Sequence, residues 1–212
     1  MIAMHKLSGI YPLQQILYRN PPVREAPLPV EPTVSLNAVV AANSIVIGDV
    51  TVEDDVFIGF HTVIRADASP PYYIGPRTNI QDFAMIHAHP GEFVEWEGRR
   101  YGVYIESDVS ILHHGSLHGP LFVGRGTFVG LRVSISAATI GRHCVVMHGA
   151  VVADGVRIAD NRFVEPGRTV WTQEQADALP EVPERYKTLN ADIVDYYCRL
   201  GKAYKASTPL AF

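Results

Sequence analysis

Three histidines stand close together in the middle of the chain, His113, His114 and His118, and a fourth, His87, precedes them. Neutral imidazole is the commonest metal ligand in proteins, and histidine also exchanges protons near neutral pH. The four side chains therefore indicate a metal site or acid–base chemistry, provided that the fold brings them together.

The segment that holds three of these histidines has an aliphatic residue at every sixth position: Ile105, Ile111, Leu117 and Val123. This spacing matches neither a helix nor a two-faced strand. Hexapeptide repeats are typical of a parallel β-helix, in which three short strands make one triangular coil. The spacing extends from Val34 to Val170, with one slip after Ile135. About 21 such positions predict about seven coils.

The repeat assigns polar residues to faces of the coil. Arg65, His87 and His118 each directly follow an aliphatic repeat position. They stack on one face of consecutive coils if the chain between residues 88 and 104 leaves and re-enters between two repeats. Strands of adjacent coils lie about 4.8 Å apart. The imidazoles of His87 and His118 can therefore converge on one metal ion at about 2.0–2.1 Å each.

His113 falls on the preceding face, one coil above Gln81 and Asp82. A side chain around a corner of the coil cannot easily reach a metal held by His87 and His118 of its own chain. It could reach the metal of a neighbouring chain. We therefore expect three chains in a closed ring, with each site shared between two of them.

The composition is that of a globular protein, with 47% hydrophobic and 19% charged residues among 212. A net charge of −4 gives no electrostatic footprint for nucleic acid. No apolar run approaches the roughly 18 residues of a membrane span, and the N-terminus lacks the pattern of a secretory signal. We expect a cytoplasmic protein. The two cysteines, Cys144 and Cys198, indicate no disulfide framework, and Cys144 is expected to be an inert core thiol.

Three regions are predicted along the chain. Residues 1–32 are rich in proline and should form an extended arm. Residues 33–172 should form the β-helix, interrupted by a hairpin flap over residues 88–104 around the Glu97-Gly98 turn. Residues 173–212 should be helical, with Thr172 and Gln175 as a capping box and an amphipathic helix from Glu184 to about Tyr204.

Several segments carry a resemblance to a known family. These are IRAD (64–67), IGPRTNIQD (74–82), IHAH (86–89), HHGSLHGP (from 113) and TQEQADALPEV (172–182). Together they resemble the γ-class carbonic anhydrases, both the archaeal enzyme and the related domain of the carboxysome scaffold. The resemblance implies a left-handed parallel β-helix and a homotrimer with a metal ion at each subunit interface. It also implies that His87 and His118 of one chain and His113 of the next are the ligands.

The implied activity is the reversible hydration of CO₂ to bicarbonate by a hydroxide generated at the metal. The implied ion is Zn²⁺ or Fe²⁺, with Co²⁺ able to substitute. By resemblance Gln81 orients the hydroxide, Asn190 helps to position CO₂, and Arg65 and Asp82 form an ion pair between subunits. Asp67 and Asn79 would support them.

The sequence also departs from the archaeal pattern. Two glutamates that serve proton transfer in that enzyme are replaced here by Ala68 and Pro90. Candidate substitutes are His89, His114 and Glu92. An alternative function therefore stays open, a trimeric carbonic-anhydrase-like protein of low or no activity that serves in assembly or binds bicarbonate. An acyltransferase with one catalytic histidine would explain neither the three histidines nor Arg65 and Gln81.

Overall fold

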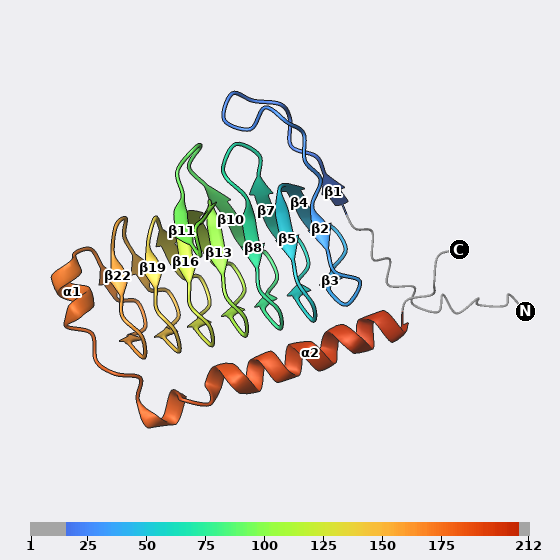
Figure 1. The fold of residues 1–212 in the computed structure, drawn as a ribbon. Helices are drawn as coiled ribbons and strands as arrows, with labels where there is room; N and C mark the ends of the chain where they lie inside the picture. The colour runs from blue at the N-terminus through green and yellow to red at the C-terminus, as the bar shows by residue number, and fades with distance from the viewer. Residues whose placement is uncertain (1–15, 208–212) are drawn as a thin grey trace, which may run out of the picture.

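The computed structural model describes residues 16–207 and shows a parallel β-helix with a long helix along one side (Figure 1). Its strands form three sheets, each joining equivalent strands of successive coils. Sheet A contains β1 (Ile16–Tyr18), β4 (Ile45–Gly48), β7 (Val63–Ala66), β10 (Met85–Ala88), β15 (Ser116–Gly119), β18 (Ser134–Ser136), β21 (Val151–Val152) and β24 (Thr169–Val170). Sheet B contains β2 (Thr33–Val34), β5 (Val50–Val52), β8 (Tyr72–Ile74), β13 (Val103–Ile105), β16 (Leu121–Val123), β19 (Thr139–Ile140) and β22 (Arg157–Ile158). Sheet C contains β3 (Val39–Val40), β6 (Phe57–Ile58), β9 (Asn79–Ile80), β14 (Ser110–Ile111), β17 (Phe128–Val129), β20 (Val145–Val146) and β23 (Phe163–Val164).

The predicted repeat positions form the core. Ile64, Ile86 and Leu117 are each at most 1% exposed, and Ile86 lies opposite both of the others in sheet A. The chain passes from sheet A to B to C in every coil, so the three connections are called here the A–B, B–C and C–A corners. The fold class predicted from the hexapeptide spacing is confirmed.

Sheet A has eight strands, one more than the coils predicted from the repeat. The additional strand is β1, which pairs in parallel with β4 and comes from the segment that we expected to be an extended arm. Leu17 of β1 packs against the core. Residues 16–18 contain no proline, so their backbone can join the sheet. The first part of the predicted arm, residues 1–15, lies outside the described residues.

Two α-helices follow the last coil. Helix α1 (Gln173–Asp177) begins with the predicted capping box between Thr172 and Gln175. A short 3-10 turn, η1 (Glu184–Tyr186), leads to α2 (Leu189–Ser207), which packs along sheet C (Figure 1). Within residues 16–207, none of the helices combines the length and the apolar character that crossing a membrane requires.

The flap is an antiparallel hairpin of β11 (Val94–Trp96) and β12 (Arg99–Tyr101). It packs on the outer face of sheet B, where the ring centroid of Trp96 lies 4.9 Å from that of Phe122 and Tyr101 lies 4.8 Å from Tyr104. The hairpin therefore covers sheet B, whereas His87 and His118 project from sheet A.

Candidate metal centre

His87 and His118 occupy equivalent positions on the neighbouring strands β10 and β15, as the repeat predicts. Their side chains converge, with 3.2 Å between His87 Nδ1 and His118 Nε2. Two nitrogens bound at about 2.0–2.1 Å to one tetrahedral metal ion are about 3.3 Å apart. The pair therefore has the separation that two ligands of a single ion require.

The other nitrogen of His87 faces a carboxylate. His87 Nε2 lies 3.3 Å from Asp67 Oδ1 and also 3.3 Å from a guanidinium nitrogen of Arg65. Arg65 is itself paired with Asp67, with 3.2 Å between Nε and Oδ2. Asp67 can only accept and Arg65 can only donate, so the two contacts favour opposite tautomers of His87; in the one in which Nε2 donates to Asp67, Nδ1 keeps its lone pair for a metal. Carboxylates orient metal-binding histidines in this way.

Burial lowers the pKa of His118 below its ordinary value, and the positive charge that His89 and His87 can carry lowers it further. The ring of His89 stands edge-on to that of His118, with 4.2 Å between their centroids. A lowered pKa keeps His118 in the neutral form that metal ions bind.

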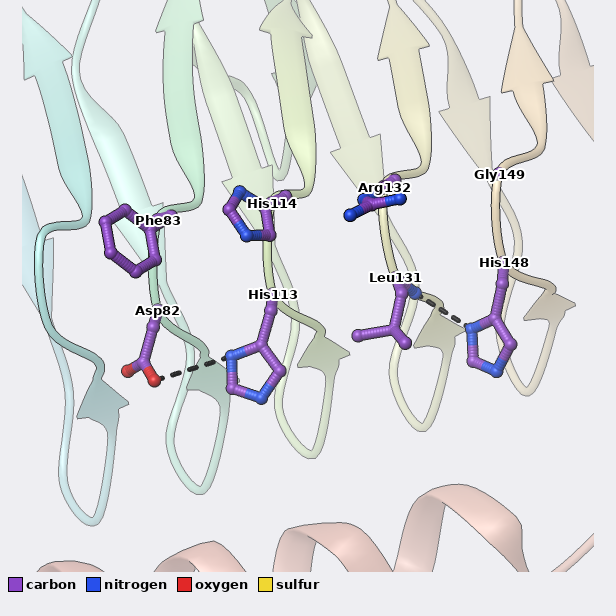
Figure 2. Close-up of a pocket in the computed structure, with 8 residues that line it drawn as sticks. All are labelled: Asp82, Phe83, His113, His114, Leu131, Arg132, His148 and Gly149. Atoms are coloured by element: carbon purple, nitrogen blue, oxygen red, sulfur yellow. Dashed lines mark hydrogen bonds and ion pairs between the residues drawn. The ribbon is translucent and has the colours of Figure 1, made fainter.

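His113 lies at the C–A corner of the coil that contains His118 (Figure 2). Its Nδ1 is 3.5 Å from Asp82 Oδ2, one coil away, as the repeat predicts. A cavity of about 670 Å³ opens along this corner. It is lined by Asp82, Phe83, His113, His114, Leu131, Arg132, His148 and Gly149.

A single chain does not gather all three histidines. Among residues 16–207 no group of three or more histidine, cysteine, aspartate or glutamate side chains could hold a metal ion. His87 and His118 present two imidazoles on sheet A, and His113 presents the third around the corner. A complete three-histidine site thus needs the corner of one chain to meet sheet A of another.

Gln81 belongs to a buried polar row beneath α2. It is 3% exposed, and its Nε2 donates to Asn79 Oδ1 at 3.0 Å. Asn79 in turn donates to Ser110 Oγ at 2.8 Å. This row fixes the side chain of Gln81 at the C–A corner, one coil from His113.

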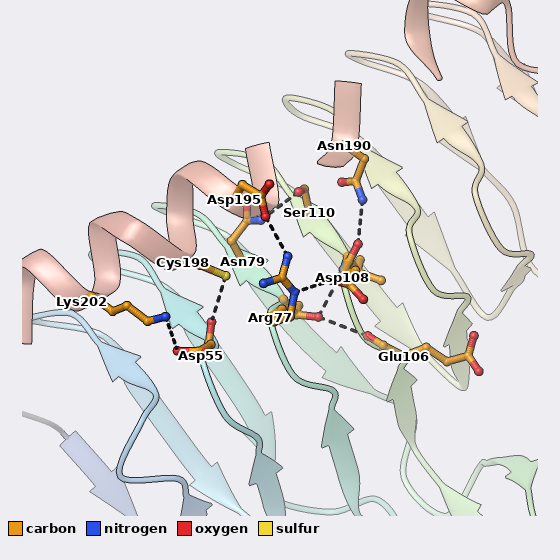
Figure 3. A network of polar contacts seen from close by, with 12 residues as sticks. Asp55, Arg77, Asn79, Glu106, Asp108, Ser110, Asn190, Asp195, Cys198 and Lys202 are labelled. Carbon is orange, nitrogen blue, oxygen red and sulfur yellow. Dashed lines mark hydrogen bonds and ion pairs between the residues drawn. The ribbon is translucent and has the colours of Figure 1, made fainter. Parts of the chain in front are cut away.

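Asn190 lies elsewhere. It is the second residue of α2, and its Nδ2 donates to the backbone oxygen of Asp108 at the B–C corner (Figure 3). The structure therefore does not bring Asn190 to the histidines of its own chain, and its expected role in positioning CO₂ stays a prediction. Within its own chain Arg65 is paired with Asp67, and the expected ion pair with Asp82 of another subunit stays a prediction.

The three candidate proton-transfer groups occupy different places. The ring of His89 contacts that of His118. The backbone N–H of Glu92 approaches the backbone carbonyl oxygen of His89 at 3.4 Å. His114 stacks on Phe83 at the C–A corner, with 5.1 Å between ring centroids. Arg132 and His148 share this corner with His113 and were not predicted; His148, like His113, lies two residues after a repeat position, and Arg132, like His114, lies three after one.

Comparison with known proteins agrees with this geometry. No family model matches the chain. A carbonic anhydrase of Methanosarcina thermophila is 33% identical over 201 residues, which cover 89% of this chain and 81% of the relative. The chain belongs to the γ-class carbonic anhydrase family.

Other similarities concern a part of the relative or the fold alone. The carboxysome assembly protein CcmM of Nostoc is 38% identical over 138 residues, which cover 65% of this family member but 25% of that longer protein. A crystal structure from Bacillus cereus, named as an acetyltransferase, superposes with a TM-score of 0.50 at 24% identity and covers 84% of this chain and 93% of the other. That likeness shows the shared β-helix and nothing about activity.

Proposed function

We propose that the protein is an active carbonic anhydrase that interconverts CO₂ and bicarbonate as a homotrimer. In this proposal His87 and His118 of one subunit and His113 of a neighbour hold one metal ion at each interface. The observation that carries it is the 3.2 Å separation of His87 Nδ1 and His118 Nε2, with His113 around the corner of the same coil. The similarity to the Methanosarcina enzyme supports the reaction.

The neutral three-imidazole set fits Zn²⁺ or Fe²⁺, with Co²⁺ as a substitute. When bound, such an ion lowers the pKa of a water molecule to about 7 and so supplies hydroxide at neutral pH.

The chain's own residues have supporting roles. Asp67 holds the ring of His87, and Gln81, fixed by Asn79, is positioned to accept from or donate to the attacking oxygen in the composite site. Arg65 is proposed to hold Asp67, with a further ion pair to Asp82 of a neighbour.

Hydration of CO₂ produces one bicarbonate and releases one proton, which must leave before the next turnover. Neither Ala68 nor Pro90 can carry it. The proposed carriers are His89, which contacts His118, Glu92, whose backbone N–H approaches the backbone oxygen of His89, and His114 at the C–A corner.

The similarity to the carboxysome assembly protein CcmM favours a second candidate, a trimeric assembly or bicarbonate-binding protein that keeps the site but has low or no activity. Metal analysis of the purified protein and stopped-flow CO₂ hydration after anaerobic loading separate the possibilities. About one ion per subunit with fast hydration supports the enzyme. The same stoichiometry with hydration at the buffer rate supports the second candidate. Absence of metal binding contradicts both.

A further inference from the structure

Two cavities meet beside the first turn of α2. Their volumes are about 370 and 230 Å³, and both are lined by Gly126, His143, Lys187 and Asn190. The histidines of the proposed metal centre line other cavities. None of these histidines lines the space beside α2.

Asn190 contributes an unused acceptor to this space. The residue is 6% exposed, and its Oδ1 is the one buried side-chain oxygen or nitrogen of residues 16–207 that lacks a hydrogen-bond partner. The orientation of the amide is fixed because Nδ2 donates to a carbonyl, Asp108 O, at 2.6 Å (Figure 3). A buried acceptor without a donor destabilises the folded protein. A ligand that carries an N–H or O–H group would remove this cost.

The surrounding groups favour an anion. The first backbone bond of α2 runs from Asp192 N to Thr188 O at 3.1 Å, so the amides of residues 189–191 are the donors that a helix start leaves free. These amides and the positive end of the helix dipole attract negative charge. His143 and Lys187 line both cavities beside them.

Most charged groups here are already paired. Arg77 binds Asp108 at 2.7 Å and Asp195 at 2.8 Å, and Lys187 binds Glu184. The carboxylate of Glu181 lines the larger cavity and opposes an anion on that side. The anion is therefore expected on the side of the smaller cavity.

Arg125 supplies a positive charge without an ion-pair partner on the side of the smaller cavity. It lines the smaller cavity, and in the described part of the chain its guanidinium makes no ion pair. The carboxylate of Glu106, which interacts electrostatically with Arg125, is held by Arg142 at 2.7 Å and by the backbone N–H of Arg125 at 2.8 Å. The Arg125 side chain is thus free to bind a ligand.

We infer that this cavity binds a singly charged or doubly charged oxoanion that still carries a proton, either bicarbonate or hydrogen phosphate. Its O–H donates to Asn190 Oδ1, and its charged oxygens face Arg125 and the start of α2. A site built to bond a hydroxyl group discriminates strongly against an analogue that lacks it. Sulfate, which has no proton at neutral pH, is therefore the diagnostic probe.

The test is calorimetric titration of the wild-type protein and of His113→Ala with bicarbonate, phosphate and sulfate at pH 7.5. Because His113→Ala removes a proposed metal ligand, binding that persists in it is independent of the metal centre and of the proposed enzyme function. In His113→Ala we expect one site per chain for bicarbonate or phosphate, with sulfate at least about tenfold weaker. The wild-type protein should show the same site in addition to binding at the metal centre. The anion that binds more tightly identifies the natural class.

Two variants complete the experiment. Arg125→Gln changes an exposed side chain and should weaken binding by about tenfold or more, whereas the matched change Arg99→Gln on the hairpin should not. Asn190→Leu should remove the preference over sulfate. Equal binding of sulfate, no binding of any anion, or binding unchanged in Arg125→Gln would overturn the inference, and the last result does not depend on the folding of Asn190→Leu.

Discussion

The ring of His87 is held from both sides, by His118 at one nitrogen and by Asp67 at the other. These contacts restrain the orientation of the ring. Sequence spacing predicted that His87 and His118 would meet, because strand register in a β-helix follows from the repeat. It could not predict that Arg65 pairs with Asp67 of its own chain, because that contact depends on side-chain rotamers at the A–B corner.

Replacing Asp67 by asparagine should weaken metal binding by about 10–100-fold, since the orienting acceptor for His87 loses its charge. The trimer and the melting temperature should be retained, because Asp67 is partly exposed and lies outside the core. Competition with a fluorescent chelator measures the affinity. Asp192→Asn, an exposed change on α2, serves as the control, and equal affinities for both variants would contradict the role of Asp67.

The two thiols should be unreactive in the folded protein. Burial raises the pKa of Cys144 to about 11 and raises that of Cys198 as well, so at pH 8 both are protonated as well as shielded. Thiolate is the nucleophilic form. Titration with a disulfide reagent at pH 8 should therefore detect no rapidly reacting thiol in native protein and two in guanidinium chloride. A fast reaction of Cys144 in the native state would show that the coil opens locally.

At the level of elements, the repeat predicted what faces inward far better than what covers the outside. Ile86 and Ile111 are completely buried, as their spacing required. The hairpin was predicted from its turn. Its packing on sheet B depends on contacts of Trp96 with Tyr104 and Phe122, which lie outside the hairpin. The strand β1 was missed because a three-residue strand within a proline-rich segment carries almost no periodic signal.

Truncation of one inward residue should be costly, because neighbouring coils hold the backbone at a fixed spacing and cannot collapse into the space. Ile111→Ala is expected to destabilise the protein by about 2–5 kcal/mol. Leu36, which is 95% exposed, provides the control, and Leu36→Ala should change stability by less than about 0.5 kcal/mol. Urea unfolding measures both. Similar midpoints for the two variants would show that the core tolerates cavities.

For the whole molecule, the proposed sites exist only where two subunits meet. Each chain offers two incomplete halves, one on sheet A and one at the C–A corner, and a ring of three chains completes three sites. The sequence suggested this division because the repeat assigns His113 to another face than His118. The placement of Asn190 could not be foreseen, since the path of the chain between α1 and α2 follows no repeat.

Mixing two inactive variants should restore activity. His113→Ala keeps sheet A intact, and His87→Ala keeps the corner intact, so an interface between them contains one complete site. After random subunit exchange of equal amounts, about a quarter of the interfaces should bind metal and hydrate CO₂. Each variant exchanged with itself is the control. Heterotrimers that bind no more metal than the separate variants would contradict the shared site.

The A–B corner has a consequence for how this protein can change in length. Inward residues are six positions apart across the B–C and C–A corners, as from Ile74 to Ile80 to Ile86. Across the A–B corner the step grows to nineteen, from Ile86 to Ile105, and shrinks to five after Ile135, while the strands on either side stay in register. Insertions and deletions therefore occur at the A–B corner alone. A foreign peptide grafted there would extend from the scaffold without shifting any coil, whereas one added residue at the C–A corner would move His113 out of line.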